Sequence, residues 1–553
     1  MISERDNDTA DALVQAFAAI RNADLQYPDD RLLECFLGES IDPEAAARYM
    51  LQRIRCSAER NDLDFEPLLS DWKHLIASFT NTFPLPRKPD RDVVAKVKRR
   101  DGGKCSITRL KGSFNDPLVV APILSMTQAV NDSLHEMLGV FVGTEMQQRI
   151  VSDNVSQHDH RNHWLVRKSV ALALSQGLLH IRQIKIKEDS ELLVCINTIG
   201  DRGYSILNNE VLRSIHRFKG QSASGTDTPE DSLLQAVSRF AKPLRWVAVA
   251  GEIANKRPRS AIRVLSSSLW HFLVEYAAAS FSAVCRLLPV TLRIRAYRFL
   301  ELLGTHLYEP SHGSRVQRLP FGMYLKTADP TFGGGLVNEY GALKLVRRHT
   351  DTPVPRPLDF VSDMGMSYML TAQVPGGPAW MSIDTLTKTE RDTFSRDLHR
   401  YLAQLRAVPK EVAPHHAICD ALGKPCYDYR IVHGLDYEEE RGYFIGPFAD
   451  EDEFNNTLQI GALPGVSHTG GHSIVLTHGD LNMRNVLIHN GRLSGIGDWE
   501  NAGWYPEYWD YTKAHFATKT HRRWLEVIEE VFEKFGDYKK ELAIERQFWN
   551  YCY

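Results

Sequence analysis

The fold of this chain is decided by the stretch Leu476–Lys513, which reads LTHGDLNMRNVLIHNGRLSGIGDWENAGWYPEYWDYTK. An apolar run ending at Leu476 predicts a strand that leads into a His-Gly-Asp loop closed by Asp480. Asn485 follows five residues later. The Asn-Gly pair at 490–491 then predicts a tight hairpin between two short strands. The second of these strands ends at Asp498, thirteen residues after Asn485.

This spacing has a chemical reason. Phosphoryl transfer needs a carboxylate that takes or orients the proton of the acceptor hydroxyl, and further oxygen ligands that hold magnesium on the nucleotide phosphates. The catalytic loop of protein kinases places an Asp and an Asn five residues apart, with a second Asp after the next hairpin. We therefore expect Asp480 to be the catalytic residue, and Asn485 and Asp498 to be the metal ligands. A lone His-Gly-Asp is more often a polar turn, but all three residues here stand in register.

The same stretch carries a family resemblance. HGDLNxxNVL followed by IxDWExAGWYPEYWDYxKA resembles the aminoglycoside phosphotransferase and choline kinase-type small-molecule kinases, and Trp499-Glu500 stands where protein kinases have Phe-Gly. The resemblance covers the chain from about Leu302 onward. It implies a bilobal protein-kinase-like fold, ATP and Mg²⁺ as cofactors, and a small hydroxylated acceptor substrate.

A kinase-like N-terminal lobe needs a phosphate-binding lysine and a glutamate that holds it. In FGMYLKT the alternation of side chains places Lys326 on one face of a predicted strand. Thirteen residues later, Glu339 lies beside the apolar face of a predicted helix. Each residue alone is more often a surface charge. Together they match the strand lysine and helix glutamate of kinases.

The remaining cofactor contacts follow from the resemblance. A strand over 367–371 leads into a hinge, and we expect backbone groups from Thr371 through Gln373 to Val374 to receive the adenine edge. The segment before the first strand offers only Gly313 and Ser314 for the phosphates, which is less than a GxGxxG loop. Acidic residues between 436 and 440 are either a rim for a cationic acceptor or a solvated loop.

Length and composition bound the remaining possibilities. A chain of 553 residues predicts two or three domains. A net charge of -3 argues against an electrostatically driven nucleic-acid or membrane partner. The eight cysteines form no CxxC pair, so a reducing, cytoplasmic location is expected, and no signal peptide is recognised. The apolar run Leu269–Val290 contains charged residues and is too short between them to span a bilayer, so no membrane partner is expected.

We therefore expect an α+β multidomain protein. Residues 1–90 are predicted to be a helical region, 221–303 a linker with a helical connector packed on the kinase-like unit, and 304–553 the kinase-like domain. Its N-lobe is expected at about 304–372 and its C-lobe at about 377–553.

Residues 91–220 resemble an HNH-nuclease module whose chemistry is lost. The glycine scaffold of RDGGKCSIT is present, but one histidine position is occupied by Ala171 and no histidine lies between Asp116 and Ser125. An HNH site needs those imidazoles to bind metal and activate water. The histidines of QHDHRNH are expected in a solvated polar loop. A basic patch nearby, Lys96 to Lys104, permits at most weak, sequence-independent nucleic-acid contact.

Three functional classes remain open at this stage. The first is a kinase of a small hydroxylated molecule. The second is a catalytically weak pseudokinase that binds nucleotide and acts as a scaffold, which the reduced glycine loop favours. The third is a nucleic-acid enzyme built on residues 91–220, which the missing histidines oppose. Neither the acceptor nor a protein partner is specified by the sequence.

Overall fold

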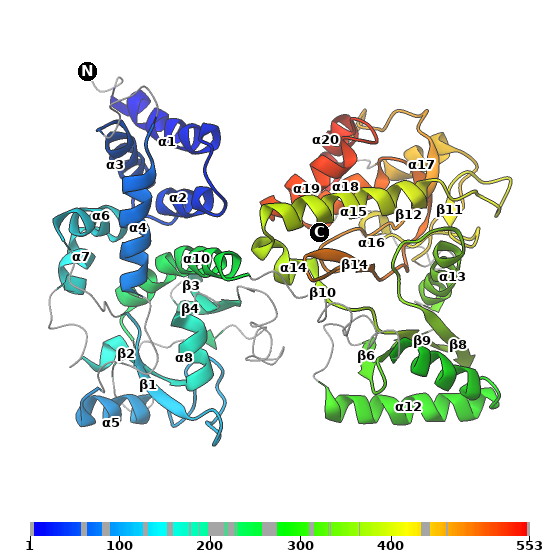
Figure 1. The fold of residues 1–553 in the computed structure, drawn as a ribbon, viewed down its shortest axis with the longest axis horizontal. Coiled ribbons are helices and arrows are strands. Elements are labelled where there is room, and N and C mark those ends of the chain that lie inside the picture. Colours follow the sequence, from blue (N-terminus) through cyan, green and yellow to red (C-terminus); the bar gives the residue numbers. More distant parts are fainter. Residues whose placement is uncertain are drawn as a thin grey trace. The chain divides into compact units, whose positions relative to one another are not determined.

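The computed structural model divides the chain into two compact units, Met1–Lys256 and Arg257–Tyr553, and each is described by itself (Figure 1). The structure describes residues 5–56, 63–79, 89–124, 131–151, 159–175, 179–186, 189–196, 216–217, 227, 229–256, 274–308, 315–329, 331, 333–363, 365–432, 443–459 and 463–549. Within these residues, no helix is both long and apolar enough to cross a membrane.

A helical core forms most of the first unit. At the centre of this core, the indole ring of Trp72 packs against the rings of Phe36, Phe141 and Phe240. The Nε1 of Trp72 donates to the carbonyl of Leu32 at 2.9 Å. These rings come from separate helices, so burying them joins segments far apart in sequence. The helices are α1 (Arg5–Asn22), α2 (Asp29–Gly38), α3 (Pro43–Cys56), α4 (Glu66–Ser78), α6 (Asp132–Val142), α7 (Thr144–Val151) and α10 (Asp231–Ala254).

The segment expected as a connector is divided between the two units. Helix α10 buries Leu233, Phe240 and Val249 in the core of the first unit. Residues 274–308, in contrast, belong to the second unit. The sequence indicated helices over both parts, but apolar helical spacing does not specify which neighbour covers each face.

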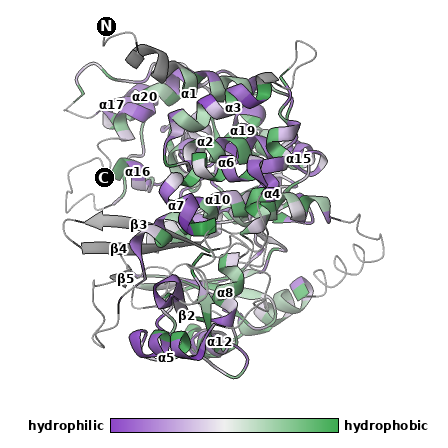
Figure 2. Ribbon diagram, turned by 90° about the vertical axis from the view of Figure 1, so that its left-hand side faces the viewer, coloured by the Kyte–Doolittle hydropathy of each residue, from purple (hydrophilic) through white to green (hydrophobic). Residues whose placement is uncertain are grey.

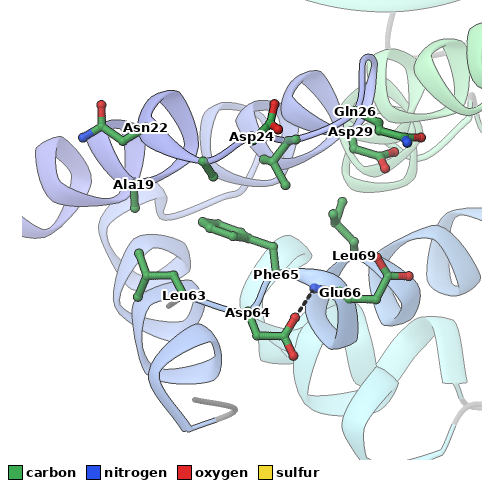
Figure 3. Close-up of a pocket in the computed structure, with 12 residues that line it drawn as sticks. Ala19, Asn22, Asp24, Gln26, Asp29, Leu63, Asp64, Phe65, Glu66 and Leu69 are labelled. Carbon is green, nitrogen blue, oxygen red and sulfur yellow. Dashed lines mark hydrogen bonds between the residues drawn. The ribbon is translucent and has the colours of Figure 1, made fainter. Parts of the chain in front are cut away.

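A cavity of about 850 Å³ lies between the end of α1 and the start of α4 (Figure 3). Its acidic lining follows from two helix starts. Asp64 accepts the backbone N–H of Glu66 at 3.0 Å, and Asp29, in the first turn of α2, pairs with Lys73 at 2.7 Å. Carboxylates are stabilised at helix N-termini by the helix dipole.

The region for which the sequence predicted an HNH-like module contains a short hairpin. Strands β1 (Leu118–Pro122) and β2 (His163–Arg167) pair antiparallel beside α5 (Arg91–Arg100) and α8 (Lys168–Ser175). Asp101 accepts hydrogen bonds from the side chains of Arg100 and Ser106 and from the backbone N–H of Leu165. This carboxylate therefore joins the Asp-Gly-Gly turn to the hairpin. A second sheet here contains β3 (Leu179–Ile186), β4 (Asp189–Ile196) and β5 (His216–Arg217).

One of the histidines expected in a solvated loop is buried, and a second, His160, is half-buried. His158 lies outside the described residues. His163 starts β2 with its side chain buried, and its Nδ1 lies 2.9 Å from the carbonyl oxygen of Asp159. Burial lowers the pKa of His163. The basic helix α5 is mostly hydrophilic, as Figure 2 shows.

The second unit begins with an antiparallel sheet in the order β6-β7-β9-β8. Adjacent residues of β9 enter different cores: Leu370 packs with α12, and Met369 packs with the core that contains α13. The sheet is therefore covered on both faces. Its elements are β6 (Val316–Leu319), β7 (Met323–Ala328), β8 (Pro357–Asp363), β9 (Met366–Ala372), α12 (Val290–Leu307) and α13 (Gly333–His349).

One of these coverings, a helical layer of residues 274–308, contains a helix over 274–285 and then α12. Asp359 of β8 receives two hydrogen bonds from Arg293 Nη1, at 3.0 and 2.8 Å, and one from the Tyr297 hydroxyl at 2.6 Å. The Ser282 hydroxyl donates to the carbonyl of Leu358. The layer is thus attached to the sheet by buried polar contacts as well as by apolar packing.

The C-terminal lobe is built around a large apolar core. Helix α15 (Lys388–Arg406) begins with a capping box between Thr387 and Glu390. The strands are β10 (Gly377–Pro378), β11 (Cys419–Asp420), β12 (Ile474–Thr477), β13 (Val486–His489), β14 (Arg492–Ile496) and β15 (Gly503–Pro506). The other helices are α14 (Ala379–Ser382), α16 (Tyr429–Val432), α17 (Glu451–Leu458), α18 (Trp509–Ala517), α19 (Arg522–Phe532) and α20 (Lys539–Phe548).

The attachment of the helical layer gives a stability prediction. Asp359→Ala leaves the guanidinium of Arg293 without its carboxylate and should lower the free energy of unfolding by about 3 kcal/mol. Asp359→Asn keeps an acceptor and should cost about 1 kcal/mol. Denaturant unfolding measures both, with Asp363→Ala at the exposed end of the same strand as a control that should change little. Equal stabilities of the three variants would contradict the attachment.

Candidate active site

The first turn of α18 holds the His-Gly-Asp loop in position. The carboxylate of Asp510 accepts the backbone N–H groups of His478 at 3.1 Å and Gly479 at 2.9 Å. Gly479 has φ +76°, and a Cβ there would lie 2.2 Å from the carbonyl oxygen of Asn501. Only glycine fits this position without displacing the backbone. The WDY motif thus positions the loop that carries Asp480.

Asp480 and Asn485 meet as expected from their spacing. The Asn485 amide Nδ2 donates to Oδ2 of Asp480 at 2.9 Å and to its backbone carbonyl at 2.9 Å. The other carboxylate oxygen, Oδ1, lies 3.4 Å from the hydroxyl of Tyr429. Burial raises the pKa of Asp480, and the ammonium of Lys513 opposes that rise. The carboxylate is held in one orientation with one oxygen beside a hydroxyl.

The predicted hairpin is present and delivers Asp498. Strands β13 and β14 pair antiparallel, and both Asn490 (φ +56°) and Gly491 (φ +75°) are left-handed, as a tight Asn-Gly turn requires. Asp498 itself has φ +64°. A left-handed conformation is costly for a residue with a side chain and is concentrated at functional sites. Trp499, fully buried, donates to the carbonyl of Ile496 at 2.8 Å and so holds the strained segment.

Lys326 joins these parts. Its Nζ lies 2.7 Å from Glu339 Oε2 on α13, 2.5 Å from Asp498 Oδ1 and 3.2 Å from Glu500 Oε2. The expected contact between Lys326 and Glu339 is therefore present, and the same ammonium reaches two carboxylates of the C-terminal lobe. Carboxylate oxygens of Glu339, Asp498 and Glu500 all lie within 4.8 Å of one another.

The charges of this cluster are unbalanced. Three carboxylates surround one ammonium, so two formal negative charges remain if all four groups are ionised. Burial raises the pKa of Glu339 to about 7, and the carboxylates of Asp498 and Glu500 act in the same direction against Lys326. Burial also acts to raise the pKa of Asp498, but the nearby Lys326 outweighs it and the pKa is lowered. A divalent cation would balance this excess.

The donor set fits magnesium. Mg²⁺ prefers oxygen ligands from one or two carboxylates together with substrate phosphates. Asp498 offers carboxylate oxygens. Because Asn485 uses its Nδ2 on Asp480, its amide oxygen is turned away from that contact and is available as a further ligand. Asp498, Glu500 and Asn485 are therefore the groups that could hold the ion.

The sequence did not indicate the buried ion pair between Lys513 and Asp428. Lys513 Nζ lies 2.9 Å from Oδ1 of Asp428 and 4.1 Å from the ring centroid of Tyr429. This ion pair is nearly inaccessible to solvent. Lys513 was visible within DYTK but without a partner, because Asp428 lies 85 residues earlier. Glu500 was noted in the sequence after Trp499 without a role.

The predicted nucleotide contacts are described only in part. Gly313 and Ser314 lie outside the described residues, as do the acidic positions 436–440. Thr371 is buried on β9 opposite Tyr324, on the same sheet face as Met369 and Lys326. The backbone N–H of Gln373 donates to the carbonyl of Gly322 at 2.8 Å. That N–H is therefore already used within the N-terminal lobe.

The region that contains these residues matches a known protein family. Residues 323–543 match the model of a phosphotransferase enzyme family, APH. The match starts at the first residue of β7, so it includes neither the first unit nor the helical layer. The C-terminal half of the chain therefore contains a phosphotransferase-family domain.

Solved structures of aminoglycoside phosphotransferases are similar at low identity. An aminoglycoside-3'-phosphotransferase of type VIII is 18% identical, with 45% of this chain and 92% of that chain covered and a TM-score of 0.31. The enzyme APH(3'')-Id from Streptomyces rimosus, in complex with ADP and streptomycin, is 18% identical, with 46% and 96% covered and a TM-score of 0.30.

The unbalanced carboxylates give a prediction for the metal. ATP with Mg²⁺ should raise the melting temperature of the wild type by about 5 °C at a hundredfold excess over the dissociation constant, because such an excess contributes about 2.7 kcal/mol. Asp498→Asn should abolish the Mg²⁺-dependent part of this rise. Thermal unfolding with and without a chelator measures it, and Asp363→Asn serves as a matched exposed control. A full response in Asp498→Asn would remove this residue from the metal site.

Proposed function

We propose that the second unit is an ATP- and Mg²⁺-dependent phosphotransferase that acts on the hydroxyl of a small molecule. The observation that carries this proposal is the single ammonium of Lys326, which contacts Glu339 of the N-terminal lobe and Asp498 of the C-terminal lobe at once. This contact needs a strand, a helix and a hairpin end to converge. The family match over residues 323–543 supports a phosphotransferase.

Lys326 is the residue that binds the nucleotide phosphates. Its side chain is 14% exposed, and its pKa is raised well above the usual value because the surrounding carboxylates outweigh the effect of burial. The ammonium therefore stays charged and can pair with the α- and β-phosphates of ATP. Glu339, held on α13, fixes the direction of the lysine. Asp498 and Asn485 would hold Mg²⁺, which when bound would neutralise charge on the phosphates.

Asp480 acts on the acceptor. Its carboxylate orients the acceptor hydroxyl and receives its proton as the new O–P bond forms and ADP leaves. Asn485 donates to Oδ2 of Asp480, so Oδ1 is the oxygen that meets the acceptor hydroxyl. The hydroxyl of Tyr429 lies 3.4 Å from this Oδ1. Lys513 supplies positive charge beside this carboxylate and so opposes the rise in the pKa of Asp480 that burial causes.

We also propose a cytoplasmic location for the reaction. Cys35, Cys105, Cys285, Cys419 and Cys426 are free and buried. Free thiols fit a reducing interior. We therefore place the reaction in the cytoplasm, where ATP and Mg²⁺ are available.

The catalytic carboxylate gives the decisive test. Asp480→Asn keeps the shape but removes the proton acceptor, so turnover should fall by about two to four orders of magnitude while nucleotide still binds. Labelled ATP with Mg²⁺ and a panel of amino-sugar, choline-like and sugar acceptors measures transfer. Asp537→Asn, an exposed surface carboxylate, is the matched control. Equal turnover in wild type and Asp480→Asn would reject the kinase and leave a nucleotide-binding scaffold.

The lysine cluster gives a second test. Lys326→Ala should weaken ATP use strongly. Glu339→Ala should cost less, because Asp498 and Glu500 still contact the ammonium. The double variant should be little worse than Lys326→Ala alone, since both residues act through one contact. Steady-state kinetics in ATP measure this coupling, with Arg348→Ala on the exposed side of α13 as control. Strictly additive losses would show that the pair does not act as a unit.

A further inference from the structure

Exposed apolar side chains are concentrated in the helical layer. Of the twenty large apolar side chains that are exposed in the described chain, ten lie between residues 276 and 307. They are Tyr276, Val284, Leu287, Leu288, Val290, Leu292, Phe299, Leu302, Leu303 and Leu307. Exposed apolar side chains that are concentrated in one segment mark a surface that binds something.

Helix α12 is apolar on two opposite sides. The inner side buries Ile294 and Tyr297 against the sheet of the N-terminal lobe. The outer side carries Leu292, Phe299 and Leu303, which are spaced by seven and four residues and so share one helical face. Phe299 is 66% exposed. The inner side already covers the sheet, so folding of this unit does not account for the outer one.

The turn before α12 extends the same apolar character. Leu287 is 84% exposed, and Leu288 and Val290 follow it. A helix face and a turn are convex features, on which side chains project outward. Such a shape fits a soft planar surface that the side chains can enter.

Three exposed arginines lie around these residues, and one of them, Arg298, has the carboxylates Glu301 and Asp363 near it. Arg286, Arg295 and Arg298 are exposed. Both carboxylates within residues 274–308, all of which the structure describes, are half-buried: Glu275 and Glu301. Glu275 also lies within 4 Å of two arginines outside the layer. The outer face is therefore apolar with a basic rim.

We propose that the outer face of the helical layer docks on an anionic lipid bilayer. Leucine and phenylalanine side chains enter the boundary of the bilayer, and the arginines contact anionic head groups. A second copy of this chain is disfavoured because a symmetric contact would bring the arginines together. The sequence expectation of no membrane partner rested on the lack of a spanning segment and on net charge, and neither excludes a local surface contact.

Sedimentation of the full chain with vesicles tests this. Phosphatidylcholine vesicles containing phosphatidylserine should bind the wild type, and vesicles of phosphatidylcholine alone should bind it at least about 10-fold more weakly. Leu287→Glu with Phe299→Glu, and separately Arg286→Glu with Arg295→Glu, should each lower binding at least about 10-fold. Phe114→Glu, a fully exposed phenylalanine of the first unit, should bind as the wild type does.

Three outcomes would overturn the proposal. One is equal sedimentation of wild type and the layer variants. A second is a dimer of the wild type in sedimentation velocity that Phe299→Glu converts to monomer, which would assign the face to a second copy. A third is absence of vesicle binding together with a lower melting temperature of Phe299→Glu, which would mean that the chain itself covers this face. Unchanged melting of the double variants shows that a loss of binding is not a loss of fold.

Discussion

The second unit depends on one buried charge. The ammonium of Lys326 is shared by Glu339, Asp498 and Glu500, so β7, α13 and the segment after β14 must be placed together to within a few ångströms. Each removal from water of an unpaired ion would be costly, and pairing offsets that cost. The excess of carboxylates then makes the site a place for further positive charge. The contacts between Lys326 and the three carboxylates therefore both hold these elements together and give the site its excess negative charge.

Contacts in both lobes hold this charge in position. In the C-terminal lobe, Asp510 holds the loop of Asp480, and Trp499 is buried beneath the strained Asp498. In the N-terminal lobe, the sheet that carries Lys326 is covered by α13 on one face and by the helical layer on the other. A lysine on a sheet fixed from both faces is held in a defined position. The outer side of the layer is then free to make contacts of its own.

Polar contacts hold the Asp-Gly-Gly turn of the first unit in place. Asp101 joins this turn to α5 and β2 through hydrogen bonds. His163 contributes a buried ring and a hydrogen bond to the backbone. Within the part of the chain that the structure describes, the grouping of three carboxylate, imidazole or thiol ligands lies in the second unit. The interactions described in the first unit are those of a folded core.

The sequence by itself determined the local parts of the site. The spacing of Asp480, Asn485 and Asp498 and the Asn-Gly turn are short-range features, because a hairpin fixes the positions of nearby residues. The tertiary structure decided what depends on contacts between distant segments: Glu500 beside Lys326, Asp428 beside Lys513, and the division of the expected connector between two cores. Periodicity predicts that a helix has an apolar face, but only packing decides which face is covered, and on α12 one such face remains exposed.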